Sequence, residues 1–435
     1  MSADTENNTK KYEEKIQHIP GDDVESIAST QKSMIEPPDG GRSWLVLAGC
    51  WCGLFSTQGY WYTWGTFLRY YNEDVFPNQM TALSWIGSLW LAMSVILGPF
   101  FNYLVARVGY RWLLGTATIL CCLATMMASL ATEIWHLYIT QGAMAGLGAS
   151  LVWFPCVSAA QQWFSKRRGL SVGIALSGSG CGGLVFSNLA QAVIDALDYR
   201  WALRIMGFII LALLTFSTCV VRPLNLPDKH VPIINLKPFK NFQFCLLFVV
   251  QFITNFAFNI PSSFLPSYAS EIGAKPMVSA NMGAIMSGVM VIGKIGSGLS
   301  SDYIGRANVT ALVILISGIL CLALWLNAYT EPAVWAFGIL FGIFGGGYMA
   351  MVPALLAQVV GLEEIEAANG LLFFAWLVGG IFGSPIASDL IDENSPDGPH
   401  YDRAIIFGGV MMIGSGLIAL TVRILRGGFN PFKKV

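Results

Sequence analysis

The sequence predicts an all-α membrane protein with twelve transmembrane helices. Of its 435 residues, 54% are hydrophobic and only 12% are charged, whereas a soluble domain usually carries about 25% charged residues. Apolar segments of about 20 residues, each long enough to cross roughly 30 Å of hydrocarbon, recur along the chain. The net charge of -1 gives no indication of a nucleic-acid partner, so the lipid bilayer is the partner that the composition requires.

The chain begins with a polar tail, residues 1–43, which we expect to be disordered and cytosolic rather than a signal peptide, because it is charged and has almost no aromatic residues. Helices are then expected at about 44–68, 82–104, 112–131, 134–160, 169–193, 201–222, 243–266, 277–301, 308–327, 332–357, 367–390 and 404–424.

A polar stretch, residues 223–242, separates six of these helices from the other six. We therefore expect an N-terminal half (44–222), a cytosolic linker, a C-terminal half (243–424) and a short cytosolic tail (425–435). Two halves of this kind suggest an internal repeat.

Lys and Arg residues are unevenly distributed between the loops on the two sides. If the N-terminus is cytosolic, the outer loops hold only Arg69, Arg200, Lys275 and Arg403, with Arg204 just inside the sixth helix. The inner side then holds Arg107, Arg111, Lys166, Arg167, Arg168, Arg222, Lys229, Lys237, Lys240, Arg306, Arg423, Arg426, Lys433 and Lys434. The positive-inside rule therefore predicts that both termini are cytosolic. It places outside the acidic loop of Asp392, Glu393, Asp397 and Asp402.

Neither a cofactor nor a metal is indicated. All nine Cys lie in apolar segments, where they behave as small hydrophobic residues and lack a metal-binding arrangement. No Gly-x-x-x-x-Gly-Lys-Ser/Thr loop for ATP occurs, and no cluster of His, Asp or Glu lies within the helices, so we expect neither an ATP-driven pump nor an enzyme.

Two turns at equivalent places in the halves share a pattern. The turn after the second helix reads Ala106-Arg107-Val108-Gly109-Tyr110-Arg111, and the turn after the eighth reads Asp302-Tyr303-Ile304-Gly305-Arg306. Glycine permits a tight turn, and arginine can bind a carboxylate or a helix C-terminus. An ordinary basic loop is the alternative, but it does not explain the matched positions.

This pair of turns resembles the loop signature of the major facilitator superfamily. The second copy fits well, with Gly298 four residues before Asp302, whereas the first copy has Ala106 in place of the aspartate and Asn102 in place of the leading glycine. A gating ion pair built on that aspartate is therefore not expected in the first half.

Three further stretches are similar to the monocarboxylate-porter branch and its fungal members. They begin at Asp39-Gly40-Gly41, at Trp163-Phe164-Ser165-Lys166-Arg167-Arg168-Gly169, and at Val360-Gly361-Leu362-Glu363, the last continuing through Asn369-Gly370. The resemblance covers about 38–425 and implies alternating access between the halves. Asp39 precedes a helix N-terminus, which favours a carboxylate. The basic run Lys166, Arg167, Arg168 is explained equally well by gating or by positive-inside topology.

Lys294 is the charged residue that lies well inside an apolar segment. An ammonium at a bilayer centre costs roughly 2.5–3.5 kcal/mol, so it needs a partner or a water-filled cavity. The resemblance implies a lysine in the first helix and an aspartate and arginine in the eighth, which fall at Tyr62, Met290 and Lys294 here. With two of the three charges absent, we expect the substrate to be the counter-ion of Lys294; the alternative is that its side chain reaches the inner surface.

Other polar and aromatic residues are candidates to line the same cavity. They are Gln58, Tyr62, Asn255, Asn259, Asn281 and Trp376. Hydrogen bonds between helices are the alternative role for the polar ones, and lipid contact or packing is the alternative for the aromatic ones.

The sequence as a whole predicts a secondary active transporter of a small organic molecule that carries a carboxylate, with protons as a candidate second partner. The alternative is efflux of a larger product such as a fungal secondary metabolite. A membrane sensor on a transporter scaffold is a third hypothesis, which the short tails disfavour. The plasma membrane is the expected location.

Overall fold

The computed structural model describes residues 39–77, 79–225, 231–273, 276–391, 400–428, 430 and 433–434. Most of the predicted N-terminal tail, residues 1–38, lies outside this part. The loop residues Lys229, Lys275, Asp392, Glu393 and Asp397 also lie outside it, so the predictions made for them stay predictions.

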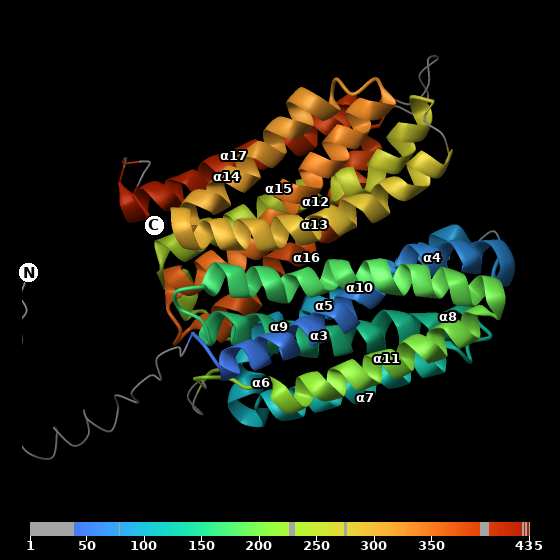
Figure 1. Cartoon of the computed structure of the whole chain (residues 1–435), viewed down its shortest axis with the longest axis horizontal. Helices are drawn as coiled ribbons and strands as arrows, with labels where there is room; N and C mark the ends of the chain where they lie inside the picture. Colours follow the sequence, from blue (N-terminus) through green and yellow to red (C-terminus); the bar gives the residue numbers. More distant parts are fainter. Residues whose placement is uncertain are drawn as a thin grey trace, which may run out of the picture. The chain divides into compact units, whose positions relative to one another are not determined.

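The described part of the chain is an all-α bundle of twelve long helical segments, which confirms the predicted fold class (Figure 1). The first six, here called the N-terminal set, are α3 (Arg42–Tyr62) continuing through α4 (Trp64–Tyr70) and η1 (Tyr71–Val75); α5 (Met80–Ile96) with η2 (Gly98–Phe100) and α6 (Phe101–Val108); α7 (Tyr110–Ala128); α8 (Ile134–Leu137) with η3 (Tyr138–Met144) and α9 (Ala145–Gln162); α10 (Arg168–Ala196); and α11 (Tyr199–Val220).

The remaining six segments, here called the C-terminal set, follow a short helix, η4 (Lys237–Lys240). They are α12 (Phe242–Glu271), α13 (Pro276–Ile304), α14 (Arg306–Ile319) with η5 (Leu320–Trp325), α15 (Glu331–Val360), α16 (Ile365–Asp389) and α17 (Asp402–Gly427). The helix expected at 367–390 begins at Ile365, so Glu366 belongs to its first turn, where the helix N-terminus favours an acidic side chain.

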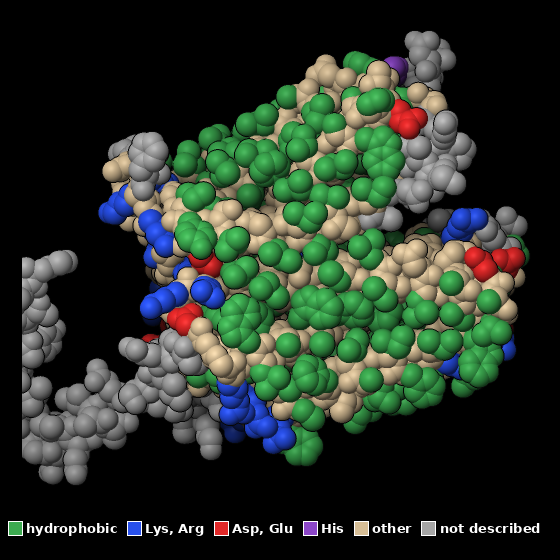
Figure 2. Space-filling model, viewed as in Figure 1, with side chains coloured by type: hydrophobic (Ala, Val, Ile, Leu, Met, Phe, Trp, Pro, Cys, Tyr) green, Lys and Arg blue, Asp and Glu red, His purple; other side chains and the backbone are tan. Residues whose placement is uncertain are grey.

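Ten of the segments are long and apolar enough to cross a membrane. The two outside this group are the segment that begins with α3 and helix α13, and both contribute polar side chains to the cavity described below. On the outside of the bundle, large apolar side chains such as Trp112, Phe208 and Ile292 are more than 60% exposed. Figure 2 shows apolar side chains covering the middle of this face. Such a surface suits lipid rather than water.

Successive segments run in opposite directions, so their ends gather at two ends of the bundle (Figure 1). The end that holds the connection between α11 and α12 is here called the linker end, and the other is called the opposite end. Lys and Arg side chains gather mainly at the linker end, on the left of Figure 2.

The two sets approach each other closely through glycines in α10 and α13. A Cβ on Gly173 would lie 2.3 Å from the backbone oxygen of Lys294, and one on Gly298 would lie 2.5 Å from that of Gly169. The ribbons of α10 and α13 diverge toward the opposite end (Figure 1). Small residues permit this helix contact in lipid, and they hold the sets together at the linker end.

Candidate functional site

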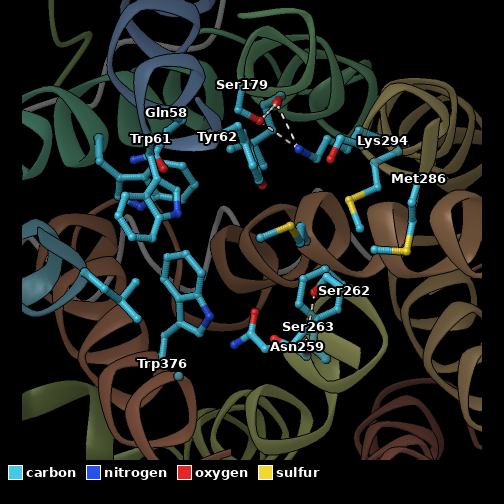
Figure 3. Close-up of a pocket in the computed structure, with 18 residues that line it drawn as sticks. Gln58, Trp61, Tyr62, Ser179, Asn259, Ser262, Ser263, Met286, Lys294 and Trp376 are labelled. Carbon is cyan, nitrogen blue, oxygen red and sulfur yellow. Dashed lines mark hydrogen bonds between the residues drawn. The ribbon is translucent and has the colours of Figure 1, made fainter. Parts of the chain in front are cut away.

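A cavity of about 240 Å³ lies between the two sets. Its lining comes from eight helices and combines aromatic, methionine and hydroxyl side chains with one cation (Figure 3). The lining residues are Gln58, Trp61, Tyr62, Leu91, Trp153, Leu176, Ser179, Phe258, Asn259, Ser262, Ser263, Met286, Ser287, Met290, Lys294, Met349, Trp376 and Gly380.

Lys294 extends from α13 across the interface to α10. Its Nζ donates hydrogen bonds to Ser179 Oγ at 2.7 Å and to the backbone oxygen of Leu176 at 3.3 Å. The side chain is only 2% exposed. The salt bridge found among the described residues joins Arg306 to Asp302 and does not involve Lys294. The ammonium is therefore held at the cavity wall by two uncharged oxygen atoms, and its position does not match a side chain reaching along its own helix to the surface.

An aromatic wall lies on the other side of the cavity from Lys294 (Figure 3). The rings of Trp153 and Trp376 lie 6.2 Å apart between centroids at an angle of 29°, and Trp61 stacks on Trp90 at 4.4 Å. Packed indoles keep their orientation, so this wall offers a preformed apolar surface. The cavity can thus bind an anionic group at one side and a planar apolar group at the other.

Most of the residues predicted for the cavity do line it: Lys294, Tyr62, Gln58, Asn259 and Trp376. Asn255 is not among them, because it is fully buried in α12, with its Cβ packed against Gly379 of α16. The side chain of Asn281 lies outside the described residues. Met290, which stands where the porter branch has an aspartate, also lines the cavity.

Trp153, Ser179 and the methionines Met286 and Met349 also line the cavity, although the sequence does not single them out. Ser179 lies in a glycine-rich run, and helical periodicity identifies its side chain only as small. No local pattern in the sequence indicates that it faces Lys294, 115 residues away. A tryptophan in an apolar helix likewise gives no signal that separates a cavity wall from a packed core.

Asp302, at the end of α13, caps the N-terminus of α10. Its two carboxylate oxygens accept hydrogen bonds from the backbone N–H groups of Gly169 and Leu170, both at 2.9 Å. Arg306, which follows the turn at Gly305, forms an ion pair with Asp302 at 3.4 Å and donates to the backbone oxygen of Ser165 at 2.8 Å. The predicted gating group of the second half therefore joins the two sets at the linker end.

Asp39, which precedes α3, makes comparable hydrogen bonds to backbone N–H groups that precede α10. Its carboxylate accepts hydrogen bonds from the backbone N–H groups of Ser165 at 2.8 Å and Lys166 at 3.1 Å. In the basic run, Lys166 and Arg167 are exposed, whereas Arg168 is buried and donates from Nε to the backbone oxygen of Phe164.

The turn after α6 lacks such a carboxylate, as its Ala106 predicts. Arg107 and Arg111 are exposed there, with Arg107 lying over the ring of Tyr103 at 5.5 Å. Gly109 and Gly305 both have positive φ, which matches the tight turn expected at each.

A second group of hydrogen bonds joins the sets near this turn. Glu366 of α16 accepts from the hydroxyl of Tyr110 at 3.2 Å and from Nε2 of Gln162. Asn369 donates to Ser158 Oγ at 2.9 Å. Glu366 is not among the predicted site residues, because the sequence suggests a loop at this position. Together with the Asp302 contacts, these bonds close the linker end.

Comparison with known proteins decides the family. A family model described as Major Facilitator Superfamily matches residues 46–384 and 247–431. The chain belongs to the Major Facilitator Superfamily. As a member, it is a multi-pass integral membrane protein and a transporter.

Several relatives of this chain come from fungi. The chain is 31% identical over 416 residues to "MFS transporter asaE" of Aspergillus flavus, covering 94% of this chain and 93% of the relative. It is 31% identical to the "Fujikurins efflux protein" of Gibberella fujikuroi, covering 88% of this chain and 83% of the relative. It is 28% identical to the "Aspyridones efflux protein apdF" of Emericella nidulans, with 91% and 84% covered.

Solved superfamily structures share the fold. The transporter FucP in its outward conformation has a TM-score of 0.68 at 15% identity and covers 87% of this chain and 99% of that one. The proton:xylose symporter XylE has a TM-score of 0.70 at 14% identity, with 87% and 95% covered.

Proposed function

We propose that this superfamily member is a secondary active exporter of an organic anion with a planar apolar body. The main support is the cavity itself, in which the cation Lys294 lies across from Trp61 and Trp376 (Figure 3), with Trp153 packed against Trp376. Relatives named as efflux proteins support the direction of transport. A molecule of the secondary-metabolite class combines such an apolar body with an acidic group.

The substitutions at Tyr62 and Met290 support a larger substrate than a short monocarboxylate. Where the porter branch is expected to have a lysine and an aspartate, this cavity has a phenol and a thioether. Methionine adapts its shape and makes favourable contacts with aromatic rings. We therefore expect the substrate to supply the counter-ion of Lys294, since the hydrogen-bond partners of its ammonium group are uncharged.

Topology follows from the charge distribution. The gathering of Lys and Arg at the linker end supports, through the positive-inside rule, our proposal that this end faces the cytosol. The closed linker end would then correspond to a state that faces outward, with the plasma membrane as the expected location and a proton gradient as the expected driving force.

The test is transport in proteoliposomes that contain the wild type, Lys294→Gln or Lys294→Arg. The probes are labelled lactate, 2-naphthoate and the neutral 2-naphthamide, each measured with and without a pH gradient. We expect naphthoate to be transported best. Lys294→Gln should reduce it at least tenfold, since a hydrogen bond to a charged group contributes about 1.5–3 kcal/mol. Lys294→Arg should retain part of the activity.

The matched control is Lys237→Gln, which removes an exposed lysine at the linker end and should leave transport unchanged. Equal transport of the acid and its amide, or no effect of Lys294→Gln, would show that Lys294 is not the anion site. Transport of lactate at least as fast as naphthoate would favour the monocarboxylate function instead.

A further inference from the structure

The two contacts that close the linker end are built differently. In one, Asp302 of the C-terminal set caps α10 of the N-terminal set and is paired with Arg306. In the other contact, the turn after α6 has Ala106 where the turn after α13 has Asp302. The carboxyl group there is instead Glu366, in the first turn of α16, the helix that packs against α6.

Glu366 is a buried carboxyl group without a cation. It is 1% exposed, and within the described part of the chain it forms no salt bridge. Among the described residues, the titratable group that contacts it is the phenol of Tyr110 on α7. From α9 it receives only the uncharged amide of Gln162.

Two side chains of the N-terminal set donate hydrogen bonds to the same carboxyl oxygen of Glu366. Tyr110 and Gln162 both donate to Oε1 of Glu366. The amide of Gln162 is fixed in this orientation because its Oε1 accepts the backbone N–H groups of Leu224 and Asn225 at 3.0 and 3.1 Å. The N-terminal set therefore supplies its donors to Oε1, and a proton on this carboxyl group would be carried by Oε2, which accepts from neither of these two side chains.

Opening of the linker end would change this environment completely. Tyr110 and Gln162 belong to one set and Glu366 to the other, so separation of the sets replaces both donors by water. An ionised carboxylate is favoured by water and disfavoured by burial without a cation, whereas the protonated form is tolerated in the buried site. The N-terminus of α16 favours the charge, but it does so in both states, because it moves with Glu366.

We propose that Glu366 is the proton-binding site of the linker-end gate, protonated when the gate is closed and ionised when it is open. Protons on the linker side then stabilise the closed gate. This inference assumes the alternating opening of the proposed transporter, but it does not depend on which substrate is carried.

The test measures the gate directly. Spin labels at Val108→Cys, in the N-terminal set, and at Lys240→Cys, in η4 directly before α12 of the C-terminal set, are both exposed at the linker end and report the distance between the sets in nanodiscs. In the wild type, the ratio of closed to open populations should rise with falling pH, by up to about tenfold per pH unit for a single linked proton. Glu366→Gln should remove this slope, and Glu366→Asp should retain it.

The matched control is Glu363→Gln, which removes an exposed carboxylate three residues away and should leave the slope intact. The proposal is overturned if Glu366→Gln keeps the wild-type slope or if Glu363→Gln loses it. If Glu366→Gln misfolds, the proposal can still be overturned. It also fails if the ratio of closed to open populations does not change with pH in the wild type or in Glu366→Asp. Transport failing in the naphthoate assay would leave these outcomes unaffected.

Discussion

The backbone N–H of Gly169, in the first turn of α10, donates to Oδ1 of Asp302 at the end of α13, with 2.9 Å between the two atoms. Since these residues belong to different sets, this bond exists only while the linker end is closed. A helix N-terminus leaves its first N–H groups without partners within the helix, and a carboxylate satisfies them well.

Asp302→Asn should therefore destabilise the closed gate. The substitution keeps the size of the side chain but exchanges charge-assisted bonds for neutral ones, a loss of about 1 kcal/mol, or roughly fivefold in the closed population. The Val108–Lys240 label pair measures this shift. Asp389→Asn, an exposed carboxylate at the opposite end, is the control, and an equal shift in both variants would contradict a role for the cap.

Gly298→Ala should disfavour the closed gate more strongly. Its new Cβ would lie 2.5 Å from the backbone oxygen of Gly169 and 3.2 Å from the Cα of Leu170. Backbone atoms cannot rotate away, so the helices must separate. Gly296→Ala, on the same helix with no atom within 4 Å of the new Cβ, should behave as the wild type in the label distances. Identical distances for both variants would rule out close backbone packing as the closing contact.

Ser179→Ala should lower the stability of the empty transporter through Lys294. Removing the hydroxyl leaves the buried ammonium with only the backbone oxygen of Leu176, a loss of about 1–3 kcal/mol. In a Lys294→Met background the same substitution should cost much less, because the ammonium is gone. Unfolding in detergent measured for all four proteins gives the coupling energy. A coupling near zero would mean that this hydrogen bond does not hold Lys294.

Trp376→Ala should weaken binding of the aromatic anion rather than the transport step. Loss of the ring opens the wall next to Trp153, and the missing aromatic contact corresponds to about 1 kcal/mol or more, at least roughly fivefold in KM for naphthoate. Phe374→Ala removes a neighbouring ring that is 38% exposed and absent from the cavity lining, and it should leave KM unchanged. A fall in kcat with constant KM would argue for a structural role of Trp376.

The sequence by itself determined the helices and their turns. In lipid each backbone polar group must be satisfied within its own segment, so a long apolar run is sufficient to specify a helix. The glycines at Gly109 and Gly305 specify the turns locally, since positive φ needs no distant partner. Lys294 could also be predicted as a site residue from the sequence, because the free-energy cost of a charge in an apolar segment is a property of that segment alone.

Only the tertiary structure decided which side chains meet. It placed Asn259 in the cavity and Asn255, one helical turn earlier, against α16, although their sequence context is alike. It brought Tyr110 to Glu366 across 256 residues of chain, so a residue expected in a loop is a buried contact between the two sets. These outcomes depend on how the helices rotate and pack against each other, and helical periodicity does not specify that rotation in segments that are apolar on most sides.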